Sequence, residues 1–207
     1  MLFEDRLDAA CQLARALGRY READPLVLAI PRGAVPMGRV IADRLDGELD
    51  VVLVRKLRSP FNPEFAIGAI DESGSFELSG ALDYTAVSRE YLEREKAAQL
   101  ARIREQRLRW SRGRPPADPA GRTVIVVDDG LATGSTMAAA LRFLRARGAG
   151  RLVCAVPVAS AQGLEHVRAL ANEVVSLAAP EPFAAVSRFY REFTQVEDET
   201  VSELLAA

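Results

Sequence analysis

Histidine, cysteine and lysine are scarce in this chain of 207 residues. His166 is the single histidine, so the chain can assemble neither a histidine-based metal site nor a Ser-His-Asp triad. The two cysteines, Cys11 and Cys154, lie far apart in apolar segments. This usage favours two reduced, buried thiols in a cytoplasmic protein over a disulfide. Lys56 and Lys96 are the lysines, so arginine carries nearly all of the positive charge.

The chain also lacks a large net charge and a long apolar run. Its 27 basic and 29 acidic residues give a formal net charge of -2, so no global field draws it to nucleic acid or to a membrane. No apolar run approaches the length needed to span a bilayer. The first 18 residues mix acids and arginines as an amphipathic helix does, and not as a signal peptide does. The arginine-rich segment 102–114 is the one feature that favours nucleic acid, but it is more typical of an exposed helix face.

What the chain does contain is a series of short apolar runs that alternate with helical patterns, over a length typical of one domain, 1–207. We expect helices at the N-terminus up to Gly18, through Val40 to Leu45, and at 87–110, 135–147 and 161–171. We expect strands at 25–30, 49–57, 66–70, 123–127, 152–159 and 173–179. Strands that are apolar throughout and alternate with helices predict an α/β fold, with a doubly wound, mostly parallel sheet covered on both faces.

Three of the predicted strands end in unusual residues. These endings are Pro31-Arg32-Gly33, Arg55-Lys56 and Asp128-Asp129. In an open parallel sheet, ligands bind outside the carboxyl ends of the strands. We therefore expect the three endings to converge on one edge of the sheet.

The third ending continues into the loop "GLATGST", between a strand and the start of a helix. Free backbone N–H groups at a helix start, hydroxyl donors and glycine together favour a bound phosphate. The loop has neither the lysine of a P-loop nor the GxGxxG spacing of a dinucleotide site. The paired carboxylates suit the vicinal hydroxyls of a ribose, so the pattern indicates a ribose that carries a 5′-phosphate. A helix capped by Thr133 or Ser135 would explain the hydroxyls but not the two aspartates.

The stretch "VIVVDDGLATGST" closely resembles the phosphoribosyl-pyrophosphate (PRPP) motif of type I phosphoribosyltransferases. "IPRGAVPMG" resembles the pyrophosphate-binding turn of that family. "VRKLRSPFNPEFAIGAI" resembles its flexible catalytic loop, most nearly that of the adenine and orotate branches. "AVSRFYREFTQVEDETV" resembles the hood segment that covers the acceptor base. The resemblance extends over about 26–200 and implies a flexible loop and hairpin region at 58–80 and a hood at 180–200.

The resemblance implies transfer of the 5-phosphoribosyl group of PRPP to a nitrogen acceptor such as a nucleobase, with Mg²⁺ as cofactor and release of pyrophosphate. Asp128 and Asp129 would hold the ribose hydroxyls, directly or through Mg²⁺. Arg32 and Gly33 would bind pyrophosphate, and Arg55 and Lys56 would neutralise its departing charge. The residues expected at the 5′-phosphate are Gly130, Ala132, Thr133, Gly134, Ser135 and Thr136.

Ala132 departs from the 6-oxopurine branch of the family, where an aspartate at this position acts as general base. A methyl group cannot take a proton, so hypoxanthine- or guanine-type chemistry by that route is disfavoured. Glu64 is the nearest replacement base. Phe189 and Tyr190 are candidates for stacking on the base, and core packing of one of them is the alternative.

Two classes of function fit this sequence. The first is an enzyme, and the second is a non-catalytic regulator that binds PRPP. The Arg-Lys pair favours the enzyme, because a regulator needs the phosphate loop but not the catalytic loop. The expected partners are PRPP, pyrophosphate and a small nitrogenous acceptor. Neither a membrane nor nucleic acid is expected as a partner, and a homodimer is compatible with the sequence.

Overall fold

The computed structural model describes residues 2–62, 66–78 and 87–207. The five strands of the central sheet are β1 (Leu26–Ala29), β2 (Glu48–Val51), β6 (Thr123–Val127), β7 (Arg151–Val158) and β8 (Glu173–Ala178). The strands of a smaller sheet are β3 (Val54–Arg58), β4 (Ala66–Asp71) and β5 (Phe76–Leu78). The α-helices are α1 (Arg6–Ala16), α2 (Val35–Leu45), α3 (Arg89–Ser111), α4 (Ser135–Ala146), α5 (Ala161–Arg168) and α6 (Asp198–Ala206). Two 3₁₀ helices, η1 (Gly18–Ala23) and η3 (Val186–Phe189), complete the description.

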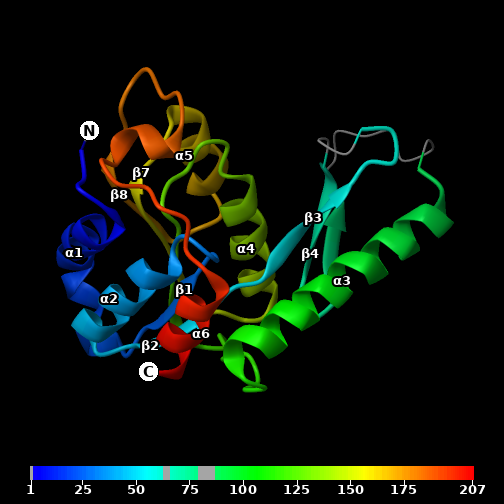
Figure 1. Cartoon of the computed structure of the whole chain (residues 1–207), viewed down its shortest axis with the longest axis horizontal. Helices are drawn as coiled ribbons and strands as arrows, with labels where there is room; N and C mark the ends of the chain where they lie inside the picture. Colours follow the sequence, from blue (N-terminus) through cyan, green and yellow to red (C-terminus); the bar gives the residue numbers. More distant parts are fainter. Residues whose placement is uncertain (1, 63–65, 79–86) are drawn as a thin grey trace.

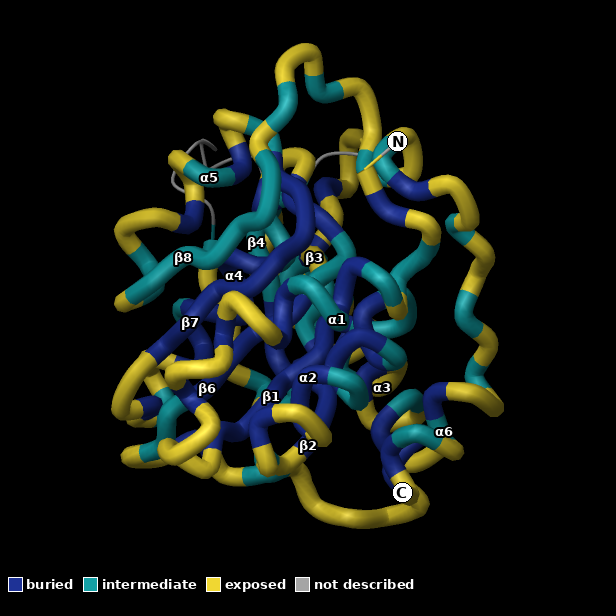
Figure 2. Tube along the Cα trace, turned by 90° about the vertical axis from the view of Figure 1, so that its left-hand side faces the viewer, coloured by how far each residue is buried: buried dark blue, intermediate teal, exposed yellow. Residues whose placement is uncertain are grey.

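The central sheet has the order β2-β1-β6-β7-β8, and every neighbouring pair in it is parallel. Its inner strands are buried on both faces because helices cover each side, which is why they appear in the sequence as unbroken apolar runs. Figure 2 shows buried residues concentrated along these strands. The α/β class and the mostly parallel sheet predicted from the sequence are confirmed.

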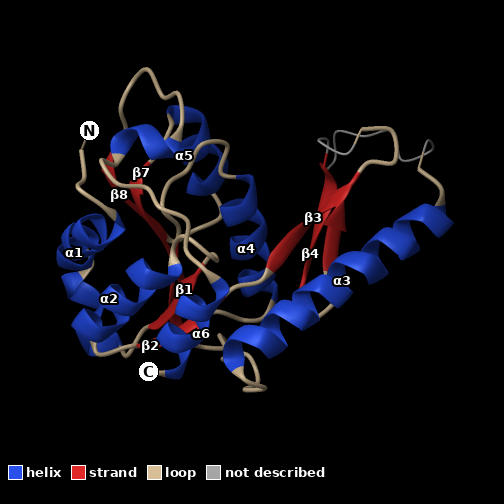
Figure 3. Cartoon of the chain, viewed as in Figure 1, coloured by secondary structure: helices blue, strands red, loops and turns tan. Residues whose placement is uncertain are grey.

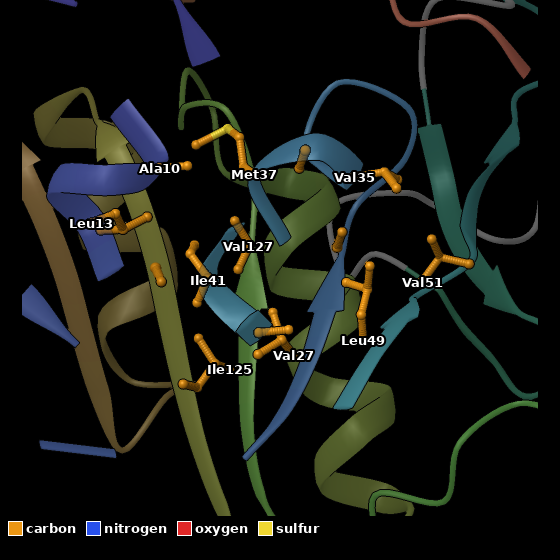
Figure 4. Packing of buried hydrophobic residues seen from close by; sticks show 14 of the residues in the cluster. Ala10, Leu13, Val27, Val35, Met37, Ile41, Leu49, Val51, Ile125 and Val127 are labelled. Atoms are coloured by element: carbon orange, nitrogen blue, oxygen red, sulfur yellow. The ribbon is translucent and has the colours of Figure 1, made fainter. Parts of the chain in front are cut away.

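Successive residues of each strand pack on opposite faces, as the two-residue repeat of a strand requires. Val27, Ile125 and Val127 pack with α1 and α2 on one face, as Figure 4 shows. Leu28, Val124 and Val126 join residues of α4 on the other face. The molecule therefore has three layers, with the sheet in the middle (Figure 1).

The smaller sheet is antiparallel, with the order β3-β4-β5, and it stands apart from the central sheet beside α3 (Figures 1 and 3). The prediction of one strand over 49–57 is therefore wrong. Pairing with β1 ends at Val51, and pairing with β4 begins at Val54. Val52 and Leu53 between them are buried, so the apolar run continues through the break and conceals it.

A buried ion cluster connects α3 to both sheets. The Arg107 guanidinium of α3 donates to Asp50 Oδ1 of β2 at 2.6 Å. It also donates to both carboxylate oxygens of Glu72, in the turn after β4, at 2.9 Å each. The exposed fractions of the three side chains are 10% for Arg107, 7% for Asp50 and 13% for Glu72. The cluster thus fixes the smaller sheet and α3 against the edge of the central sheet.

The two cysteines are free, and Cys154 is buried in β7. Burial raises the pKa of the Cys154 thiol to about 12. Within residues 2–62, 66–78 and 87–207, no helix has both the length and the apolar character of a membrane span.

Candidate active site at the carboxyl edge of the sheet

The loops after β1 and β6 lie side by side, because these strands are parallel neighbours in register from Leu26 and Val124 onward. A Cβ atom built on Gly33, in the first loop, would lie 2.3 Å from Asp129 Oδ2 in the second. Glycine is therefore required at position 33 for the two loops to approach this closely. The predicted convergence of Arg32 and Gly33 with Asp128 and Asp129 is confirmed in its geometry.

The two aspartates differ in their surroundings. Asp128 Oδ1 accepts a hydrogen bond from the backbone N–H of Asp129 at 2.9 Å. Burial raises the pKa of Asp128 well above its usual value, and the adjacent Asp129 carboxylate raises it further. Asp129 instead has a cationic partner, Arg6, whose Nε and Nη2 donate to Asp129 Oδ2 at 3.1 and 2.9 Å.

Arg6 is a residue of the site that the sequence did not reveal. It is the first residue of α1, 123 positions away from Asp129, and its side chain is only 11% exposed. Its Nη1 donates to the Thr194 carbonyl at 2.6 Å, and its guanidinium lies 3.7 Å from the centre of the Phe193 ring. No motif marks an arginine at the start of an amphipathic helix, so only the tertiary fold identifies it.

The phosphate loop ends at the start of α4. Gly134 is the N-cap, with φ +71°, and it has no side chain to cap the helix, although the backbone N–H of Ser135 makes a long contact of 3.5 Å with Thr133 Oγ1. The hydroxyls of Thr133 and Ser135 lie 3.1 Å from each other, in front of the helix start. The alternative in which Thr133 or Ser135 serves as N-cap therefore loses its support. Apart from that of Ser135, the N–H groups of the first turn have no side-chain cap and are available to an anion.

The α5 segment holds this loop from behind. The backbone N–H of Ser160 donates to the Leu131 carbonyl at 2.8 Å, and His166 Nδ1 lies 2.9 Å from the Thr133 carbonyl oxygen. Gly130 packs against Val186, because a Cβ built on it would lie 2.7 Å from that side chain. The loop is thus fixed by the segments that follow it, while Ala132 and Thr133 remain exposed.

Arg32 follows β1 by three residues, and the peptide bond between Pro31 and Arg32 is cis. Its Nη1 lies 3.5 Å from Asp198 Oδ1 and 3.8 Å from Glu197 Oε2, at the start of α6. Asp198 also accepts hydrogen bonds from Arg109 Nη1 at 2.6 Å and from Trp110 Nε1 at 3.1 Å. The predicted pyrophosphate-binding arginine is therefore in contact with acids of the C-terminal helix.

A cavity of about 500 Å³ lies between this edge of the sheet, the smaller sheet and α3. Among the described residues that line it, the charged ones are Arg32, Arg55, Lys56 and Arg58, and none is a carboxylate. Thr136 of the phosphate loop also lines it. The cavity thus brings together three of the predicted site segments and has the charge of an anion-binding site.

Arg55 and Lys56 differ in their packing, as their alternation on β3 requires. Arg55 Nη2 donates to Gln106 Oε1 of α3 at 3.2 Å, whereas its buried Nε has no hydrogen-bond partner within the described part of the chain. Burial, with the nearby charges of Arg102 and Arg58, lowers the pKa of Arg55. Lys56 is exposed and also lines a second cavity, of about 630 Å³, together with Ser135 and Arg142 of α4.

The two predicted hood aromatics have different environments. Tyr190 is 2% exposed, its ring lies 5.4 Å from that of Phe3, and its hydroxyl donates to the Asp129 carbonyl at 2.7 Å. Phe189 is half-buried and pairs with Phe183, with ring centres 5.0 Å apart. Core packing therefore describes Tyr190, and stacking on a base stays a prediction for Phe189.

Glu64, the candidate replacement base, lies outside the described residues. Magnesium at the acid pair can be tested against the contacts of Asp129. Arg6 donates twice to Asp129 Oδ2, so this oxygen already has a cationic partner, and a Mg²⁺ contact of Asp128 and Asp129 stays a prediction. Within the described residues, no group of three or more Asp, Glu, His or Cys side chains could hold a metal ion.

Comparison with known proteins places this site in a family. Residues 5–193 match the family model of the phosphoribosyl transferase domain, so the chain belongs to this family of transferases. Two curated proteins of Mycobacterium tuberculosis, from strains CDC 1551 and H37Rv, are each 41% identical to this chain over 208 residues. Both are named as phosphoribosyl transferases on a provisional basis. Each match covers 99% of this chain but 46% of the relative, so the chain spans about half the length of these relatives. Among solved structures, the crystal structure of the protein TT1426 from Thermus thermophilus superposes on this chain with a TM-score of 0.88. The two sequences are 46% identical, and the match covers 99% of this chain and 98% of TT1426.

Proposed function

We propose that the chain transfers the 5-phosphoribosyl group of PRPP to a nitrogen acceptor and releases pyrophosphate. The observation that carries this proposal is the junction of an acid pair, an uncapped helix start and a cationic cavity at one edge of the sheet. These three features match, in order, the ribose hydroxyls, the 5′-phosphate and the pyrophosphate of PRPP.

Each part of the substrate has a proposed place. Asp128 and Asp129 accept hydrogen bonds from the ribose hydroxyls. The residues proposed at the 5′-phosphate are Gly130, Ala132, Thr133, Gly134, Ser135 and Thr136. Arg32, with the backbone at Gly33, binds pyrophosphate, and Arg55 and Lys56 line the cavity into which its charge develops.

The proposed reaction needs little covalent chemistry from the protein. As the C1′–O bond to pyrophosphate breaks, negative charge grows on the leaving group and positive charge on the ribose ring. The acceptor nitrogen then forms the new bond to C1′, and its proton passes to pyrophosphate or to water. Fixed cations at the cavity and fixed carboxylates at the ribose stabilise both charges, and the phosphate loop anchors the substrate. Mg²⁺ enters this scheme as the partner of pyrophosphate in the substrate, because a hard cation needs few ligands from the protein.

The acceptor is proposed as a small nitrogenous molecule such as a nucleobase, held beneath the hood segment near Phe189. A cytoplasmic location fits the free cysteines and belongs to the same proposal. A homodimer is compatible with the proposal, but the proposal does not depend on one.

The decisive experiment measures pyrophosphate release from PRPP and Mg²⁺ across a panel of purines, pyrimidines and small amines. Release that depends on one acceptor would support the proposal. Tight PRPP binding with no release for any acceptor would replace the enzyme with the non-catalytic regulator. Failure to bind PRPP would refute both functions.

A further inference from the structure

The pair formed by Arg6 and Asp129 joins the first helix of the chain to the proposed ribose site. We infer that Arg6 is a positioning residue of this site, which fixes the Asp129 carboxylate and supplies there the positive charge that a metal ion would otherwise bring. The inference rests on the proposed function, because it assigns Asp129 to the ribose.

Two elements confine the Asp129 carboxylate, and a third holds its backbone. The Arg6 guanidinium of α1 contacts Oδ2 through both Nε and Nη2. Gly33, in the loop after β1, leaves so little space that a Cβ there would lie 2.3 Å from the same oxygen. Tyr190, in the hood segment, donates to the backbone carbonyl of Asp129. Oδ2 is thus enclosed, and Oδ1 is the oxygen left to accept a hydrogen bond from a ligand.

The guanidinium is itself held from the other side. Phe193 lies against its face at 3.7 Å, and the Thr194 carbonyl accepts from Nη1 at 2.6 Å. Both residues belong to the segment 180–200, in which the sequence predicts the hood. Arg6 therefore links the first helix, the hood segment and the acid pair, and its planar fork fixes the direction of the carboxylate as a lysine could not.

The charges also favour a built-in cation. The side chains of Arg6 and Asp129 are 11% and 19% exposed, so water screens their attraction only weakly. The Asp128 carboxylate next to Asp129 adds repulsion when it is ionised. A metal ion bound directly at Asp129 would have to displace or oppose the guanidinium.

The expected consequence is that the two ends of the substrate differ in how far their binding depends on Mg²⁺. The ribose end should bind without metal, since Arg6 already balances Asp129. The pyrophosphate end, where Asp198 and Glu197 contact Arg32, should depend on Mg²⁺. Calorimetric titration with ribose 5-phosphate and with pyrophosphate, each in excess Mg²⁺ and in excess chelator, separates the two ends.

For the wild-type chain, the affinity for ribose 5-phosphate should be the same with Mg²⁺ and with chelator. The substitution Arg6→Gln should weaken ribose 5-phosphate binding by about 10- to 100-fold, by analogy with the loss of residues that orient the ligands of a metal ion. It should leave Mg²⁺-pyrophosphate unchanged. Arg6→Lys should be intermediate, because the charge stays but the fork is lost. Arg15→Gln, at the exposed far end of the same helix, is the matched control and should change neither ligand.

Several results would overturn the inference. One is a wild-type chain that binds ribose 5-phosphate only with Mg²⁺, and this measurement needs no variant to fold. Another is an Arg6→Gln chain that binds ribose 5-phosphate as the wild type does. Equal weakening of both ligands by Arg6→Gln or by Arg6→Lys would show a merely structural role. A wild-type chain that binds neither ligand would refute the proposed function itself, which is a distinct outcome.

Discussion

The ion cluster around Arg107 gives a sharp prediction about stability, through the substitution Arg107→Met. Arg107 donates four hydrogen bonds, two to Glu72 and one each to Asp50 and the Val51 carbonyl, all between 2.6 and 2.9 Å. Methionine keeps much of the apolar stem but leaves two buried carboxylates without their cation. Breaking a buried ion pair from one side costs about 3–5 kcal/mol, so we expect a loss of this size in the free energy of unfolding.

Denaturant unfolding at neutral pH measures this loss, with Arg94→Met as the matched control. Arg94 pairs with Glu90 four residues earlier on the same helix, but both side chains are exposed, so its loss should be about 0.5 kcal/mol or less. A second comparison removes the stranded charges through the triple substitution of Arg107→Met, Asp50→Asn and Glu72→Gln, which should recover part of the loss. An Arg107→Met chain no less stable than the Arg94→Met control would refute the assignment of the cluster as the clamp between the sheets.

The cluster also gives the sign of a pH effect. Burial raises the pKa of Glu72, and the hydrogen bond from Arg107 opposes that rise. A carboxyl group whose pKa is higher in the folded state binds protons more readily there, so its contribution to stability declines as the pH rises. Removing Arg107 should raise the pKa further. The loss caused by Arg107→Met should therefore be larger at pH 8 than at pH 5, and an equal loss at both would contradict this reasoning.

Four further predictions concern the site and the residues around it. Arg32→Ala should weaken pyrophosphate much more than ribose 5-phosphate in calorimetric titration, and equal losses would mean that the turn only packs the sheet. Asp198→Asn should strengthen pyrophosphate binding, since a carboxylate 3.5 Å from Arg32 competes with the anion for that arginine. Unchanged affinity would show that Asp198 does not influence anion binding at Arg32. The hydrogen bond from Arg109 lowers the pKa of Asp198. The stability that this acid contributes should therefore be present at neutral pH and lost as the pH falls below its ordinary value of 3.8. Unfolding of the wild type and of Asp198→Asn at several pH values measures this change. Hypoxanthine and guanine should be poor acceptors in steady-state turnover, also after Ala132→Asp, because one carboxylate does not rebuild a pocket, and fast wild-type turnover of either would refute this expectation.

The sequence was sufficient for the central sheet because each strand carries its own signal. An apolar run such as 123–127 is buried on both faces wherever helices cover both sides of a parallel sheet. The same reasoning placed Arg32 and Gly33 beside Asp128 and Asp129, since parallel strands end at one edge. Family resemblance then supplied roles for these residues, and those roles stay predictions.

What the sequence could not supply are contacts between segments without a local signal. The break at Val52 and Leu53 is hidden because both residues are buried, so the apolar pattern runs on from one sheet into the other. Arg6 resembles any other charged residue of an amphipathic helix until the fold brings it to Asp129. Asp198 belongs to α6, a helix absent from the elements expected from the sequence.

Gly33 has a mechanical consequence that extends beyond fit. Because no side chain separates the loop after β1 from the Asp129 carboxylate, the two loops are in direct contact, and neither can move toward the other unless the other also moves. We therefore expect a ligand that orders one loop to order its neighbour, so that the second ligand binds to a surface that has already lost part of its conformational freedom. In thermodynamic terms, the two ends of the substrate should bind cooperatively, and by linkage each should raise the affinity of the other by the same factor.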